Sequence, residues 1–95
     1  MRLGTNRGNP RLWLEGAILT EAGFDRGTRY AVTIGSAAIV LDVAPDGKRS
    51  VAGKTKAGGA NHPIIDMNGA YLAPFANRDL TLTSHNGRII IIREA

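Results

Sequence analysis

The side chains best suited to acid–base chemistry in this 95-residue chain are its two histidines, His62 and His85. A ribonuclease needs a general base and a general acid that converge on a phosphate, with a cation nearby. Asp66 is the carboxylate nearest to His62 in the sequence, but no spacing forces the histidines together. Both lie in turn-like sequences, "NHP" and "SHNG", which ordinary turn chemistry explains. The pattern assigns no catalytic residue and leaves ribonuclease activity as the one enzymatic alternative.

Metal and cofactor chemistry have no recognisable residue pattern. The chain contains no cysteine, and two separated histidines form no familiar set of metal ligands. The glycines form neither a G-x-G-x-x-G motif nor a P-loop. We therefore predict no metal and no cofactor. Apolar runs are far shorter than the roughly 20 residues that span a bilayer, and no signal sequence is recognisable, so we expect a cytoplasmic protein without membrane contact.

Basic side chains indicate a different chemistry, the binding of an acidic partner. Twelve lysines and arginines against eight aspartates and glutamates give a net charge of +4. That balance favours nucleic acid, although a charge of this size is also ordinary for a soluble domain. The cations gather in two Gly-rich segments that could mould to a phosphate backbone, or could simply be a solvated arm and linker. The candidate nucleic-acid-binding residues are Arg2, Arg7, Arg11, Lys48, Arg49, Lys54 and Lys56.

Trp13 is the aromatic residue whose position calls for an explanation. It lies in "PRLWLE", where Leu12 and Leu14 alternate with the more polar side. A tryptophan on an exposed strand face could stack on a base or fill a pocket of a protein partner. The interpretation favoured here is that it covers one end of a small core, and Trp13 is kept as a candidate partner contact.

Positioning these side chains requires a strand–helix–hairpin unit over residues 10–43. The strand "PRLWLE" leads into a short helix in "GAILTEAG", which Gly23 is placed to end. The segments "RYAVTI" and "AIVLDV" then predict a hairpin. The apolar residues expected to face inward in this hairpin are Tyr30, Val32, Ile34, Ile39, Leu41 and Val43.

A second, degenerate copy of this unit is predicted over residues 62–94. Pro10, Gly16 and Leu19 have counterparts in the second half at one constant spacing, and Ile39 and Leu41 have counterparts at a slightly shorter one. These counterparts are Pro63, Gly69, Leu72, Ile89 and Ile91. One unit is too small to close a core, so the two would share a single domain over residues 1–95. Residues 1–9 are predicted to be a flexible arm, and 44–61 a basic Gly-rich linker or loop.

The first unit resembles the SymE toxin family, part of the AbrB/MazE swapped-hairpin superfamily. The resemblance rests on Gly16, Leu19, "EAGF" at Glu21 to Phe24, Gly27–Thr28 and the hairpin that follows. In this superfamily two such units normally come from two chains and interlace into one barrel, and the MraZ proteins are similar in carrying two units in one polypeptide. The resemblance implies a mostly β fold with short helices, an AbrB-type swapped-hairpin barrel formed as a pseudo-dimer within one chain.

Charge and resemblance together predict non-catalytic nucleic-acid binding, with double-stranded DNA ahead of RNA. The protein would be a transcription regulator or a nucleoid-acting toxin, active as a monomeric pseudo-dimer or as a homodimer. The first alternative is a small mobile-element or phage protein that binds and inhibits a host protein. The second is an RNA-cleaving toxin, because SymE-like proteins are commonly labelled so.

Overall fold

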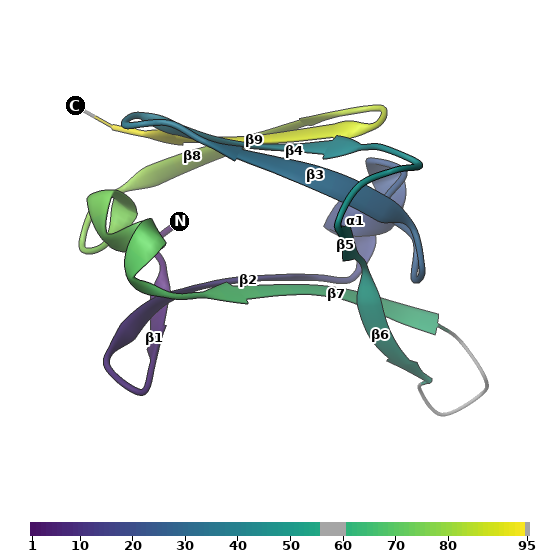
Figure 1. The fold of residues 1–95 in the computed structure, drawn as a ribbon, viewed down its shortest axis with the longest axis horizontal. Helices are drawn as coiled ribbons and strands as arrows, with labels where there is room; N and C mark the ends of the chain where they lie inside the picture. The colour runs from purple at the N-terminus through teal and green to yellow at the C-terminus, as the bar shows by residue number, and fades with distance from the viewer. Residues whose placement is uncertain (56–60, 95) are drawn as a thin grey trace.

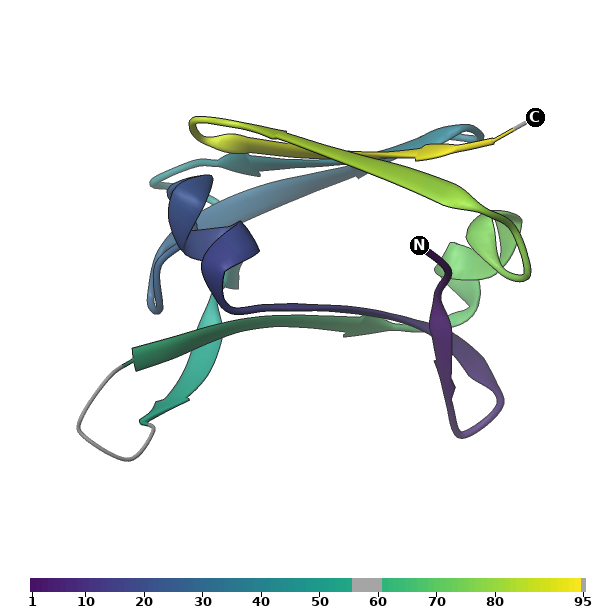
Figure 2. The same ribbon diagram turned by 180° about the vertical axis from the view of Figure 1, so that it is seen from behind.

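Two β-sheets that face each other make up most of the molecule (Figures 1 and 2). The computed structural model describes residues 1–55 and 61–94. Sheet A has the order β1-β2-β7-β6 and sheet B the order β5-β3-β4-β9-β8. The strands are β1 (Gly4–Asn6), β2 (Asn9–Glu15), β3 (Arg29–Ile34), β4 (Ala38–Val43), β5 (Arg49–Ser50), β6 (Ala52–Thr55), β7 (Asn61–Asn68), β8 (Leu80–His85) and β9 (Arg88–Arg93). The helices are α1 (Ala17–Glu21) and the 3-10 helix η1 (Ala70–Phe75). The prediction of a mostly β chain with short helices is therefore confirmed.

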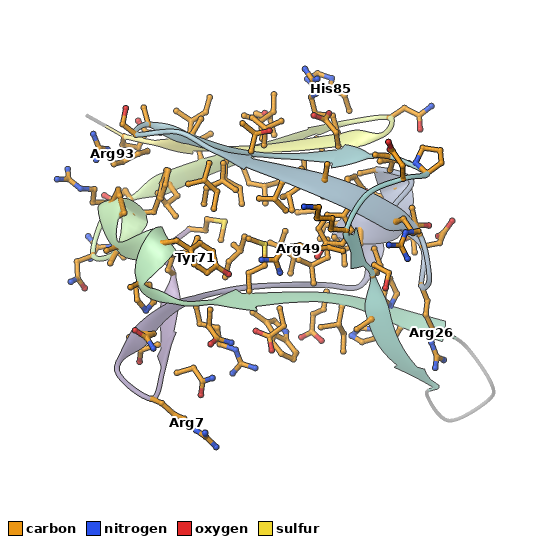
Figure 3. The ribbon with its side chains drawn as sticks, in the orientation of Figure 1. Arg7, Arg26, Arg49, Tyr71, His85 and Arg93 are labelled. Carbon is orange, nitrogen blue, oxygen red and sulfur yellow. The ribbon has the colours of Figure 1, made fainter. Side chains whose placement is uncertain are left out.

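The core lies between the sheets and follows the alternation of each strand. Leu12 and Leu14 of β2 are buried as expected, as are Ile39 and Leu41 of β4. Apolar side chains fill the interior (Figure 3), and among the described residues no polar or charged one is buried. Each large apolar side chain removed from water stabilises the fold by about 1.5–3 kcal/mol before conformational entropy is counted. This packing holds two small sheets together without a disulfide.

The strand register of sheet B has an approximate twofold symmetry. Its β4 and β9 are antiparallel, and Val40 lies opposite Ile90. The neighbouring pairs are Ile39–Ile91 and Leu41–Ile89. Exchanging each residue for its counterpart in the other half converts the pair Ile39–Ile91 into the pair Leu41–Ile89, and the pair Val40–Ile90 maps onto itself.

Sheet A repeats this symmetry about the pair Trp13–Asp66. The flanking pairs of β2 and β7 are Leu12–Met67 and Leu14–Ile65. Reciprocal hydrogen bonds close both ends: the Gly16 N–H donates to the Pro63 carbonyl at 3.1 Å, and the Gly69 N–H to the Pro10 carbonyl at 3.2 Å. The two halves therefore exchange main-chain bonds in the same way at both sheets.

The N-terminal residues are paired, which corrects the prediction of a flexible arm. Residues of β1 pair with β2, and the Met1 α-amino group donates to the Leu80 carbonyl at 2.7 Å. Leu3 packs against the core between these two contacts. Polar, Gly-rich residues show no alternation that would predict a strand, but the free edge of β2 supplies hydrogen-bond partners that such residues can use.

The segment 44–61, predicted to be a basic Gly-rich linker or loop, contains strands in its described part. Here β5 pairs with β3, Val51 is buried, and β6 pairs with β7. Its pair Ala52–Ile64 matches the pair Gly4–Arg11 of the first half. The symmetric unit thus begins near residue 1 and again near residue 49, earlier than the predicted starts at 10 and 62.

The sheets do not close into the predicted barrel. Strands β5 and β6 follow each other in the chain, yet β5 belongs to sheet B and β6 to sheet A. Between these two strands the chain crosses from one sheet to the other at the buried side chain of Val51, and the hydrogen-bonded ladder does not continue. Each sheet therefore ends in edge strands. No helix within the described residues is long or apolar enough to cross a membrane.

Two local predictions have different outcomes. Gly23 has a φ of 85°, and the adjacent Phe24 N–H donates to the Leu19 carbonyl at 2.8 Å, so Gly23 does follow the end of α1 as predicted. Ile34 and Val43 were expected to face the core, but both are exposed, Ile34 by 36%. Each is the last residue of its strand, and Ile34 lines an open pocket between β3 and η1 instead of packing in the core.

Candidate functional site

The outer face of sheet A carries a cluster of Arg11, Trp13 and Asp66. Arg11 donates through Nε to Asp66 Oδ1 at 2.8 Å and through Nη2 to Oδ2 at 2.9 Å. The Arg11 guanidinium carbon lies 4.6 Å from the centroid of the Trp13 ring. Trp13 is 40% exposed, so the favoured interpretation that it covers the core is wrong. Because Leu12 and Leu14 point inward, the residue between them must point outward.

Asp66 fixes the position of this cluster. The hydrogen bond from Arg11 lowers the pKa of the Asp66 carboxyl, burial opposes that effect, and the charge of Arg11 reinforces it. The carboxylate therefore stays ionised at neutral pH and holds the guanidinium over the indole. Two parallel N–H···O bonds fix an arginine more firmly than a single contact does. The exposed tryptophan is thus presented in one orientation.

Two hairpins flank this cluster and project from sheet A on the side away from sheet B (Figures 1 and 2). The first is formed by β1 and β2, with Arg7 in its turn at a φ of 53°. The Arg7 side chain points away from the molecule (Figure 3). The second hairpin is formed by β6 and β7. Arg26 lies beside it, because a Cβ on Gly53 of β6 would meet the Arg26 stem at 3.0 Å. We call this surface the saddle face, defined by Arg7, Arg11, Trp13, Arg26 and Asp66.

The predicted nucleic-acid-binding cations do not gather on one surface. Arg7 and Arg11 belong to the saddle face, whereas Arg2 forms an exposed ion pair with Asp79 at 2.9 Å. Lys48 and Arg49 line a pocket between the sheets. The backbone of Lys54 lies in β6 opposite His62, and Lys56 falls outside the described residues. Arg26 is a saddle-face cation that is absent from the residues selected in the sequence.

The two histidines lie on different sheets. His62 Nε2 is 2.7 Å from Glu15 Oε2 in sheet A, whereas His85 ends β8 in sheet B and points outward (Figure 3). A ribonuclease site built on both histidines therefore has no geometric basis. Glu15 is the carboxylate that His62 contacts, not Asp66, because the pairing of β2 with β7 decides proximity. Over residues 1–55 and 61–94, no group of three or more His, Cys, Asp or Glu side chains could hold a metal ion.

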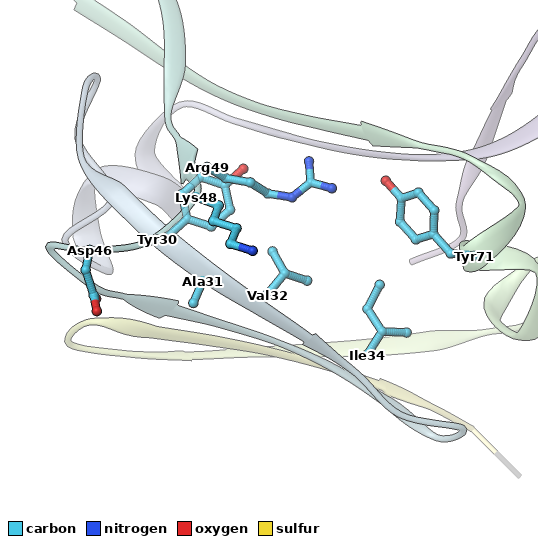
Figure 4. A pocket seen from close by; sticks show the side chains of 9 residues that line it. Tyr30, Ala31, Val32, Ile34, Asp46, Lys48, Arg49 and Tyr71 are labelled. Carbon is cyan, nitrogen blue, oxygen red and sulfur yellow. The ribbon is translucent and has the colours of Figure 1, made fainter.

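A pocket of about 510 Å³ opens between β3, the residues before and within β5, and η1 (Figure 4). We call it the tyrosine pocket, lined chiefly by Tyr30, Val32, Ile34, Lys48, Arg49 and Tyr71, with Asp46 also on its wall. The pKa of the Tyr30 phenol is raised, chiefly by burial. The positive charge of Arg49 opposes this increase, and the interaction with Tyr71 adds to it. Sequence reasoning did not find this pocket, because Tyr30 and Tyr71 come from different halves.

No protein-family model, curated protein or solved structure matches this chain. The resemblance to the SymE family therefore stays a prediction.

Proposed function

We propose that this protein binds nucleic acid without cleaving it, double-stranded DNA in preference to RNA, and that the saddle face makes the contact. We further propose that the fold is an AbrB-type swapped-hairpin pseudo-dimer within one chain. The reciprocal pairing of β2 with β7 and of β4 with β9 supports this, since each half completes both sheets of the other. A transcription regulator or nucleoid-acting toxin would use such a fold.

The observation that carries the proposal is the shape of the saddle face together with its charge. Two hairpins rise on either side of the β2–β7 floor, with Arg7 in the turn of one and Arg26 beside the other. Phosphates border a DNA groove on both sides, so paired projections can contact both backbones while a β-ribbon approaches the base edges. Trp13, in the floor between them, offers an aromatic plane with a guanidinium stacked on it.

One cation of the saddle face has no carboxylate partner. Arg2, Arg88 and Arg11 are each matched by a carboxylate. Arg7 has no such match among the described residues, so its charge is available to a phosphate. The net charge of +4 adds a long-range attraction that does not depend on sequence.

The test is fluorescence anisotropy of a labelled, mixed-sequence DNA duplex at about 50 and 200 mM salt. We expect affinity to fall steeply with salt, because bound cations release counterions. The double variant Arg7→Gln/Arg26→Gln should weaken binding about tenfold at the lower salt and reduce the salt slope by about 2. The control is Arg88→Gln in β9 of sheet B, which loses one positive charge outside the saddle face and should leave the slope unchanged.

Salt-independent binding, or equal losses in the control and the double variant, would contradict the saddle face as a DNA surface. The same titration with labelled single-stranded RNA distinguishes the two nucleic acids, and the RNA length after incubation reports on cleavage. We expect the RNA to stay intact and to bind more weakly than the DNA duplex.

A protein partner is the second candidate, and the exposure of Trp13 favours it. Tryptophan is enriched among residues that dominate protein interfaces. In that case Trp13→Ala would abolish capture of the partner, whereas Arg7→Gln/Arg26→Gln would change it little. The DNA titration with Trp13→Ala separates the candidates. If Trp13 serves only a protein partner, DNA affinity should not change; if Trp13 lies against the duplex, affinity should fall while the salt slope is retained, because no charge is lost.

A further inference from the structure

The tyrosine pocket has the size and lining of a small-molecule site. Its volume of about 510 Å³ falls within the roughly 300–1,000 Å³ typical of ligand pockets. Val32 and Ile34 form an apolar floor on β3, and Tyr71 stands across from them on η1 (Figure 4). Ile34 is 36% exposed and Tyr71 42%, so both present apolar surface that the fold itself does not cover.

The polar groups of the pocket converge from separate elements. Arg49 of β5 pairs in register with Tyr30 of β3, and its side chain extends across the pocket toward the hydroxyl end of Tyr71 (Figure 4). Tyr30 is 3% exposed as a whole residue, and it lines the pocket. In the described part of the chain no buried side-chain oxygen lacks a hydrogen-bond partner, so the Tyr30 hydroxyl, which no described residue bonds, is accessible to solvent. A ligand oxygen in the pocket can replace the water that hydrates it.

The charge of the lining selects the sign of the ligand. The lining contains the cations Lys48 and Arg49 and a single carboxylate, Asp46, and in the described part of the chain neither cation forms an ion pair. An arginine fork without a protein carboxylate matches the geometry of an incoming carboxylate or phosphate. Because the excess is one positive charge, a ligand with a single negative charge fits better than a triphosphate.

The opposite side of the molecule shows that the fold does not require these polar groups. The counterparts of Tyr30 and Val32 are Leu80 and Leu82 on β8, and the counterpart of Tyr71 is Ile18 beside Leu19 on α1. All three of these apolar residues pack into or against the core. The position of Arg49 is taken by Met1, which pairs with Leu80. Tyrosines and cations therefore occupy only one of two equivalent openings.

We propose that the tyrosine pocket binds a small organic monoanion with a flat aromatic or branched apolar body. The Arg49 guanidinium receives the carboxylate, and the hydroxyls of Tyr30 and Tyr71 donate hydrogen bonds to it or to an adjacent oxygen. The apolar body lies against Val32 and Ile34. This function is separate from nucleic-acid binding, because the pocket opens between the sheets and the saddle face lies outside sheet A.

The experiment uses three probes with the same ring system and different charge: 2-naphthoate, neutral 2-naphthamide and cationic 2-naphthylmethylammonium. Each is titrated into the whole chain while backbone amide shifts are followed by NMR. For 2-naphthoate we expect saturable shifts at residues 30–34, 46–49 and 71. The amide should bind about tenfold more weakly, as expected for the loss of a charge-assisted hydrogen bond, and the cation weaker still.

Variants then assign the contact. Arg49→Gln should weaken 2-naphthoate about tenfold and change 2-naphthamide little. Tyr71→Phe keeps the ring and should produce a smaller loss, while Arg88→Gln is the charge-matched control and should bind both probes as the wild type does. Arg49 lies on an exposed edge strand, so folding should be retained, and the amide spectrum verifies this for every variant.

Equal affinity for the three probes, no localised shifts, or an unchanged affinity of Arg49→Gln for 2-naphthoate would each overturn the proposal. Its failure is distinguishable from failure of the DNA proposal, because Arg49→Gln should keep the affinity for DNA within about twofold of the wild type.

Discussion

The two edges at which sheet B meets sheet A are equivalent in backbone and different in side chains. At one edge, β5 pairs with β3 and leads through buried Val51 to β6. At the other, Met1 pairs with Leu80 and leads through Leu3 to β1. The first edge opens into the tyrosine pocket, whereas the second is occupied by aliphatic side chains.

This difference shows which features of the two halves the fold constrains and which it leaves free to differ. Main-chain hydrogen bonds do not depend on side-chain identity, so the register of β2 with β7 and of β4 with β9 tolerates divergent sequences. Core positions keep apolar volume, because interiors are close-packed and sensitive to single methylene groups. Side chains at the edge where the two sheets meet carry neither constraint, and at one of these edges the first half supplies Tyr30 while the second supplies Arg49 and Tyr71. The polar and charged side chains of the pocket therefore lie where the two halves differ in sequence.

The saddle face is asymmetric in the same sense. Trp13 and its counterpart Asp66 lie opposite each other at the centre, and Arg11 corresponds to Ile64. One half supplies the stacked guanidinium and indole, and the other supplies the carboxylate that holds them. A face with an aromatic centre on one side only would not contact the two arms of a palindrome equally. If it reads DNA, we infer a target without twofold symmetry.

The largest expected effect tests whether both halves contribute equally to the core. Leu19 of α1 and its counterpart Leu72 of η1 are each 0% exposed. We expect Leu19→Ala and Leu72→Ala each to lower the free energy of unfolding by about 2–5 kcal/mol, with values within about 1 kcal/mol of each other. Urea denaturation followed by tryptophan fluorescence measures both. For a small domain, losses of this size are a large part of the total stability.

Ile92→Ala is the control for this pair, because Ile92 is apolar but exposed on β9. Its expected loss is below about 1 kcal/mol. A large loss at Leu19 with almost none at Leu72 would mean that the first half forms the core and the second merely covers it.

A smaller effect distinguishes the two glycines that start the helices. Gly16 has a φ of 80°, and an added Cβ would meet His62 Cε1 at an acceptable 3.4 Å, so Gly16→Ala introduces mainly backbone strain of about 1–2 kcal/mol. At Gly69 the φ is 153° and the Cβ would lie 2.5 Å from Tyr71 Cε1. Gly69→Ala should therefore destabilise by about 2–3 kcal/mol, and it should also displace the Tyr71 ring from the pocket.

A double-mutant cycle separates the two terms. Tyr71→Ala removes the collision, so adding it to Gly69→Ala should recover part of the loss in unfolding free energy, whereas adding it to Gly16→Ala should not. Gly8→Ala is the strain-only control, with a φ of 83° and no atom within 4 Å of an added Cβ. Additive effects at Gly69 and Tyr71 would contradict the close contact between them.

Local patterns in the sequence predicted most of the strands, and long-range pairing decided the rest. Alternation located β2, β4 and the inward positions Leu12 and Leu14, and Asn86–Gly87 forms the turn between β8 and β9. The short strands β1, β5 and β6 could not be predicted, because their residues have no strand preference of their own. They form where β2, β3 and β7 leave hydrogen-bonding groups at an edge.

The candidate site was predictable only in part for the same reason. Basic side chains marked Arg7 and Arg11, and the strand alternation placed Trp13 on the more polar side. The partners of these residues depend on register: Asp66 reaches Arg11 and Glu15 reaches His62 only across the β2–β7 pair. The tyrosine pocket needs Tyr30 and Tyr71 from opposite halves, and no periodicity in one segment reports that kind of proximity.

The smallest expected effect is a difference in pH response between the two edges. Burial raises the pKa of Tyr30, and its counterpart Leu80 has no ionisable group. The folded state therefore favours the neutral phenol, which adds stability below the unfolded pKa of about 10 and loses it as pH rises through the folded pKa. The urea midpoints of the wild type and of Tyr30→Phe are compared from about pH 8 to 11. As the pH rises, the midpoint of the wild type should fall relative to that of Tyr30→Phe, because only the wild type has a phenol that ionises at this position.

In Tyr71→Phe, where Tyr30 is the remaining tyrosine, absorbance at the tyrosinate band should rise only above about pH 10. Parallel pH curves for the wild type and Tyr30→Phe would mean that the phenol stays hydrated, and the two edges would then differ in shape but not in electrostatics.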